Sequence, residues 1–158
     1  MELSKELLSK RVLSRRQCLG GIMSLCGALL LPARAFAGTL SAFKATETKS
    51  VIADLFGDLP IEESAAVKLR APDIAENGAV VPVSVATDIA GVESISLIID
   101  ENPNPLSATF DLTPEVVANV SFRVKMGKSS TVSALVKTAD KIYVATREVK
   151  VTIGGCGG

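Results

Sequence analysis

The amino-acid sequence predicts a mainly β protein, an antiparallel β-sandwich preceded by one short helix. Short β-branched segments recur at intervals of roughly ten residues from residue 66 onward, and turn residues separate them. Several of the segments alternate apolar with polar positions, as strands with one buried face do. The architecture indicated is an immunoglobulin-like sandwich, without a disulfide between its sheets because the cysteines for one are absent.

The elements follow in order along the chain. A helix is expected over residues 49–56, where the apolar spacing suits one or two turns, and Gly57 and Pro60 would end it. Strands are expected over residues 66–70, 80–86, 92–99, 109–112, 120–125, 131–138, 142–146 and 148–153. Asn77-Gly78 is a strong turn signal. Pro82 indicates an edge strand or a position among the first residues of its strand.

Two of these strands have informative patterns. Residues 94–99 alternate in a way that predicts a half-buried strand. In the last strand Val149, Val151 and Ile153 should face one way and Lys150 and Thr152 the other, which fixes the register up to Ile153.

The first 37 residues are expected to be a cleaved export signal. Arg15 and Arg16 form a twin-arginine pattern, an apolar run follows over residues 19–31, and Ala35-Phe36-Ala37 offers a cleavage site before Gly38. The run is shorter than the roughly 20 residues that span a bilayer, so an N-terminal membrane anchor is the weaker alternative. The expected domain plan is therefore a signal over residues 1–37, a β-sandwich domain over residues 38–153 and a C-terminal arm over residues 154–158, with a periplasmic location.

Removing the signal changes the charge. The full chain has 17 basic and 17 acidic residues, whereas residues 38–158 contain 11 basic and 15 acidic residues and a net charge of −4. An acidic product argues against nucleic acid or an anionic membrane surface as a partner.

The residue types also exclude most catalytic sites. The chain contains no histidine, which removes Cys–His pairs, Ser–His–Asp triads and histidine-based metal sites. It also lacks a CxxC pair and a phosphate-binding glycine loop, so we expect neither an enzyme nor a bound metal or cofactor.

One thiol is left once the signal, with Cys18 and Cys26, is gone. Cys156 lies between Gly154-Gly155 and Gly157-Gly158, where the glycines favour a flexible arm rooted in the last strand. A nucleophile on a tether, with no catalyst in its own chain, indicates covalent attachment of a group on which partner proteins act.

The residues from Val149 to Gly158 resemble the ending of the SoxY family, the sulfur-carrier subunit of a thiosulfate-oxidation system. Residues 102–106 followed by 108–110 resemble the central loop and strand of that family, and the twin-arginine signal fits it as well. Cys18 and Gly20 depart from the usual signal pattern.

The resemblance implies an immunoglobulin-like sandwich that pairs with a SoxZ-like subunit exported with it as a folded complex. Cys156 would carry the intermediates covalently, first as a cysteine S-thiosulfonate and then as sulfane sulfur. A haem enzyme would conjugate thiosulfate to it, a thiosulfohydrolase would release sulfate, and a sulfane dehydrogenase, if present, would oxidise the remaining sulfur. A rival reading remains open, in which an exported structural sandwich dimerises through a disulfide at Cys156; the carrier itself could also form higher oligomers this way.

Overall fold

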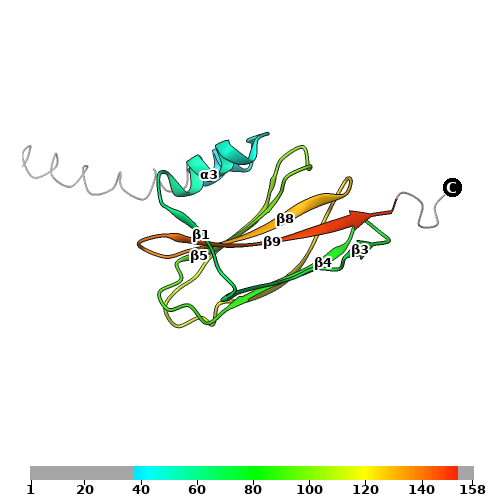
Figure 1. The fold of residues 1–158 in the computed structure, drawn as a ribbon. Helices are drawn as coiled ribbons and strands as arrows, with labels where there is room; N and C mark the ends of the chain where they lie inside the picture. Colours follow the sequence, from blue (N-terminus) through cyan, green and yellow to red (C-terminus); the bar gives the residue numbers. More distant parts are fainter. Residues whose placement is uncertain (1–37, 153–158) are drawn as a thin grey trace, which may run out of the picture. The chain divides into compact units, whose positions relative to one another are not determined.

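The computed structural model describes residues 38–152 as two β-sheets and a helical segment over residues 38–56, in which residues 38–42 and the helix α3 (Thr48–Phe56) are helical (Figure 1). The predicted mainly β sandwich is confirmed. The export signal over residues 1–37, Ile153 and the arm over residues 154–158 lie outside the described residues.

The helix α3 covers Thr48–Phe56, close to the predicted range. Gly57 ends it with a φ of 61°, a left-handed conformation that glycine adopts without strain, and the Gly57 N–H donates to the Ala53 carbonyl at 3.0 Å. Val51 and Phe56 are the buried side chains of the helix, so its apolar face lies against the sheet.

The larger sheet has the order β1-β9-β8-β5-β6, with β3 also pairing with β9. Its strands are β1 (Ile61–Glu63), β3 (Ile74–Ala75), β5 (Ser94–Ile99), β6 (Leu106–Asp111), β8 (Ser130–Lys137) and β9 (Ile142–Val151). The smaller sheet has the order β2-β4-β7, with β2 (Val67–Arg70), β4 (Val81–Thr87) and β7 (Asn119–Val124).

The main core lies between the two sheets. Alternate residues of β4 are buried, as predicted, and they pack against Ile95, Leu97 and Ile99 of β5. One open side of the sandwich is closed by Phe110 of β6 and Phe122 of β7, whose ring centroids lie 5.0 Å apart.

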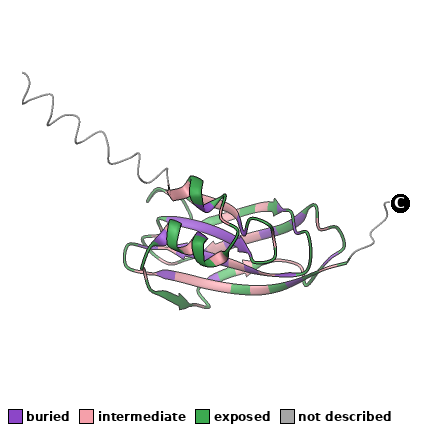
Figure 2. Ribbon diagram, turned by 90° about the horizontal axis from the view of Figure 1, so that it is seen from above, coloured by how far each residue is buried: buried purple, intermediate pink, exposed green. Residues whose placement is uncertain are grey.

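Strand β5 is buried on both faces, so the prediction of a half-buried strand was wrong. Its second face is covered by α3, which packs with Ile98, Leu106 and Leu135 in a separate apolar cluster. Figure 2 views the domain from the helix side and shows buried strand segments beneath it. The helix thus adds a third layer to the sandwich.

Strand β9 is a single ten-residue strand, whereas the sequence predicted two strands over 142–146 and 148–153. Its pairing with β8 runs without a break from Ile142 to Val149, and this ladder keeps the strand continuous through Arg147. On its other edge β9 pairs in parallel with β1 and then β3, two short strands that the sequence did not predict. The sandwich is therefore not wholly antiparallel.

Pro82 lies in β4, the central strand of its sheet, so the edge-strand alternative was wrong. It is the second residue of β4, which agrees with the other alternative. On the side of β2, pairing with β4 reaches only Ser84, so the ladder on that side stops before the proline.

Candidate functional site: the root of the cysteine arm

The predicted site residues Cys156, Gly154, Gly155, Gly157 and Gly158 lie outside the described residues, as do the export-signal residues Arg15 and Arg16. The structure describes the segment that leads to the arm, the last residues of β9 up to Thr152. We call residues 149–152 the arm root.

Both edges of the arm root are hydrogen-bonded. On one edge β3 runs parallel to it: the Lys150 N–H donates to the Asp73 carbonyl at 2.9 Å, and the Thr152 N–H donates to the Ala75 carbonyl at 3.1 Å. On the other edge, the Val151 N–H donates to the Ser129 hydroxyl at 2.9 Å, just beyond the end of the β8 ladder. The side chain of Ser129 therefore continues the ladder by one more bond.

The arm root is also anchored in the core. Val149 is fully buried in the main core, and Val151 packs partly buried against it. Lys150 and Thr152 are exposed, as the predicted alternation requires. The root is thus part of the packed sandwich up to the last described residue.

Gly78 lies against the arm root, and its role there was not visible in the sequence. The Met126 N–H donates to the Gly78 carbonyl at 2.7 Å. A Cβ atom on Gly78 would lie 2.3 Å from the Met126 carbonyl oxygen and 2.9 Å from Cγ1 of Val151. The Asn77-Gly78 signal predicted a turn, and the Asn77 side chain does accept a bond from the Ala79 N–H at 2.9 Å. What requires glycine is the close approach of the backbone of Met126 and the side chain of Val151.

The loop over residues 100–105, the loop of the sequence resemblance, links the turn beside the arm root to the helical segment. Asn102 bridges that turn: its amide donates to the Lys125 carbonyl at 2.8 Å and its side-chain oxygen accepts from the Gly127 N–H at 3.2 Å. The Thr48 hydroxyl of α3 donates to the Asp100 carboxylate at 2.8 Å. Short polar side chains therefore fix a loop that contains two prolines.

The charged groups along β9 form ion pairs with the strands beside it. Arg147 pairs with Asp73 at 2.7 Å, just before β3. At the far end of β9, a hydrogen bond from Lys141 to Glu62 and the negative charge of that carboxylate raise the pKa of Lys141 above its ordinary value. Both pairs are partly exposed and join β9 to the segment over residues 61–75.

Within residues 38–152 no group of His, Cys, Asp and Glu side chains has an arrangement that could hold a metal ion. In the same part of the chain no helix is long and apolar enough to cross a membrane.

The sequence and the fold of this chain resemble those of known proteins. The family model of the sulfur oxidation protein SoxY matches residues 52–156, a range that includes the arm root and Cys156. The structure of the sulfur carrier protein SoxY from Chlorobium limicola f thiosulfatophilum is similar to this chain, with 47% sequence identity and a TM-score of 0.63, over 68% of this chain and 97% of that one.

A crystal structure of an engineered protein also matches, with 18% identity and a TM-score of 0.38, over 56% of this chain and 21% of that one, too weakly to support an argument. No curated protein matches the chain. The family match and the Chlorobium structure together show that the chain belongs to the SoxY family of sulfur oxidation proteins.

Proposed function

We propose that this protein carries sulfur intermediates of thiosulfate oxidation as covalent adducts on Cys156 in the periplasm. The relative from Chlorobium is a sulfur carrier protein, and the family supports a carrier role in sulfur oxidation rather than catalysis. The observation that supports this function most directly is the family match across residues 52–156, which extends from the sandwich through the glycine-flanked cysteine.

The chemistry on the thiol follows two balanced steps. In the first, the Cys156 thiol and thiosulfate form an S–S bond with loss of one proton and two electrons, and the haem-containing partner enzyme accepts the electrons. In the second, water attacks the terminal sulfonate sulfur, and the bond between that sulfur and the sulfane sulfur breaks. Sulfate leaves, two protons are released, and the sulfane sulfur stays bonded to Cys156 as a persulfide anion. A sulfane dehydrogenase would then oxidise the persulfide sulfur. Covalent attachment keeps the reactive sulfane sulfur from exchanging with other thiols between these steps.

The division of roles follows from the residues. The chain has no histidine, so no imidazole is present to activate the thiol or to act as a general base. The partner enzymes must supply activation, and the carrier supplies a rigid root at Thr152 and four further residues to Cys156. A SoxZ-like subunit completes the carrier as a heterodimer, and the twin-arginine signal exports the folded pair.

The experiment is intact-mass analysis of the carrier with its SoxZ-like subunit after incubation with thiosulfate and the haem-containing enzyme. Wild type should gain the mass of one thiosulfonate group on the peptide over residues 154–158, and the thiosulfohydrolase should reduce it to the mass of one sulfur atom. Cys156→Ser should gain neither mass. A wild-type protein that stays unmodified, or ends only as a disulfide-linked homodimer, contradicts the proposed function.

Localisation is tested separately. Arg15→Lys with Arg16→Lys should keep the protein and its SoxZ-like subunit in the cytoplasm, as judged by cell fractionation. Unchanged periplasmic accumulation would contradict the proposed export route.

A further inference from the structure

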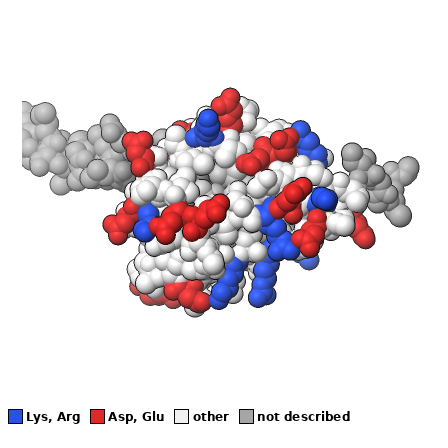
Figure 3. Space-filling view, viewed as in Figure 1, with Lys and Arg blue, Asp and Glu red and all other residues white. Residues whose placement is uncertain are grey.

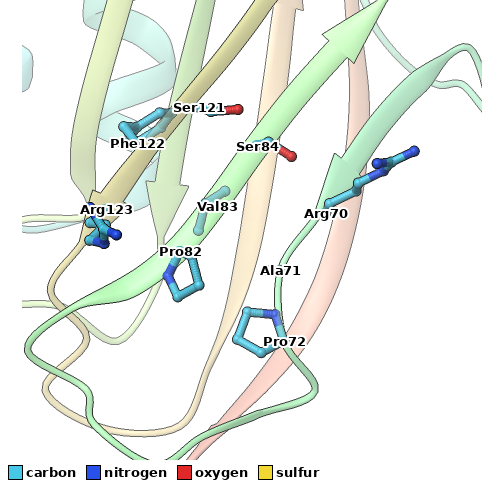
Figure 4. A pocket seen from close by; sticks show the side chains of 9 residues that line it. All are labelled: Arg70, Ala71, Pro72, Pro82, Val83, Ser84, Ser121, Phe122 and Arg123. Atoms are coloured by element: carbon cyan, nitrogen blue, oxygen red, sulfur yellow. The ribbon is translucent and has the colours of Figure 1, made fainter.

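The outer face of the three-stranded sheet contains a hollow of about 520 Å³. Arg70, Ser84 and Ser121 lie in one row across β2, β4 and β7, and Arg123 lies opposite Pro82 in a neighbouring row. Figure 4 shows the two arginines on opposite sides of the hollow, with Pro82 and Ser84 between them. The hollow forms where β2 ends and the chain turns away at Pro72, while β4 and β7 continue. We call this surface the basic hollow.

The charge of this face opposes that of the domain. Strands β2, β4 and β7 contain three basic residues and no aspartate or glutamate, although residues 38–158 together have a net charge of −4. Lys68 pairs with Asp88 at 3.0 Å, but no ion pair within residues 38–152 involves Arg70 or Arg123. In Figure 3 two basic side chains project from the lower middle of the domain, with acidic side chains beside them at the lower left.

The chemistry of the basic hollow favours carboxylates of a transient partner. A guanidinium group binds a carboxylate through two parallel hydrogen bonds. The Cα atoms of Arg70 and Arg123 lie two strands and two residues apart, which separates them by about 12 Å, so each arginine can bind a different carboxylate. Ser84 and Ser121 add hydroxyl donors between them. Permanent subunit interfaces are mostly apolar, whereas exposed single-sign charges mainly accelerate encounter and set specificity.

The basic hollow adjoins the arm root. Pro72 lines the hollow, and the carbonyl of the next residue, Asp73, accepts the hydrogen bond of Lys150 in the arm root. Four residues span at most about 14 Å, so a protein seated on the basic hollow would have Cys156 within reach.

We infer that the basic hollow is the docking site for an acidic surface on the enzymes that load and process the sulfur cargo. This inference rests on the proposed carrier function and adds a recognition surface to it. Arg70 and Arg123 bind carboxylates of the docking enzyme, and the arm then enters that enzyme from a fixed starting point.

The test uses the full carrier with its SoxZ-like subunit as the substrate of the haem-containing enzyme and of the thiosulfohydrolase. Arg70→Glu with Arg123→Glu should raise the KM for the carrier about tenfold or more at low ionic strength and leave kcat unchanged, because charge reversal slows encounter. The wild-type KM should rise with salt and with added polyglutamate, and the variant should lose both responses.

Lys44→Glu with Lys49→Glu is the matched control. Both lysines are exposed on the helical segment, on the opposite side of the sandwich from the smaller sheet. Two Lys→Glu changes alter the net charge by as much as two Arg→Glu changes do. Its KM should stay within about twofold of wild type if docking is confined to the basic hollow.

The outcomes separate this inference from the proposed function. Equal KM values and equal salt responses in wild type and the arginine variant, with Cys156 still loaded, overturn the docking site alone. Loss of the SoxZ-like subunit from the arginine variant would also overturn it, because the surface would then belong to the permanent interface. Absence of any adduct on wild-type Cys156 would instead refute the carrier function itself.

Discussion

Gly78→Ala tests the role of close packing at the arm root. The new Cβ atom would lie 2.3 Å from the Met126 carbonyl oxygen, about 1 Å closer than an ordinary contact of 3.4 Å, and 2.9 Å from Cγ1 of Val151. The Met126 contact is with backbone, so it cannot be relieved by a rotamer change. The segment around Gly78 must therefore move away from residues 126 and 151.

The energetic consequence follows from the two interactions that this movement disturbs. Overpacking of a well-packed site costs about 1–3 kcal/mol. Weakening the 2.7 Å bond from the Met126 N–H to the Gly78 carbonyl removes about 1 kcal/mol more. Alanine returns about 0.4–1 kcal/mol by restricting the unfolded chain. The net expectation is a loss of about 2 kcal/mol, which lowers the urea midpoint by about 1 M.

The assay is urea unfolding monitored by circular dichroism, carried out on residues 38–158 and on the complex with the SoxZ-like subunit. Gly127→Ala is the control, because its Cβ atom would meet nothing within 4 Å, and it should change stability by less than about 0.5 kcal/mol. Equal midpoints for Gly78→Ala and Gly127→Ala would refute the packing argument. In amide hydrogen exchange, Gly78→Ala should accelerate exchange at the amides of Val151 and Thr152 more than at those of β5.

Three further predictions concern other parts of the fold. Val149→Ala, at a fully buried position, should cost about 2 kcal/mol in urea unfolding, and a loss below about 0.5 kcal/mol would contradict the anchoring of the arm root in the core. Phe56→Ala should lower the free energy of unfolding by about 3 kcal/mol and raise the amide hydrogen-exchange rates in α3, because this side chain packs α3 against the sheet. An unchanged urea midpoint would mean that the packing of the helix adds no stability. Glu62→Gln should lower the pKa of Lys141, as seen by NMR titration. Since that pKa is raised in the folded state, the stabilisation is present below the ordinary value and is lost as pH rises through the folded value; a Lys141 pKa that stays raised in Glu62→Gln would exclude Glu62 as the cause.

The class of fold and the direction in which many strand residues face could be predicted from the sequence. Alternating residues in the predicted strands over 80–86 and 120–125 face the core as their period of two requires, because side chains alternate across a strand. Gly57 marked the end of the helix, since only glycine takes its left-handed conformation without strain. The absence of histidine and the glycine-flanked cysteine are also readable without coordinates, because they are facts of composition.

The contacts that the strands make depend on how distant parts of the chain pack together. The burial of Ser94–Ile99 on both faces depends on α3 covering the second face, a non-local contact that no local period reveals. The short strands at 61–63 and 74–75 are too short to give a pattern, and they form because β9 offers an open edge. The close approach at Gly78 and the placing of Arg70 and Arg123, which form no ion pair within residues 38–152, on one face of the smaller sheet likewise arise from segments distant in sequence. Local periodicity fixes which way a side chain points, but what lies opposite it is set by the packing of the whole chain.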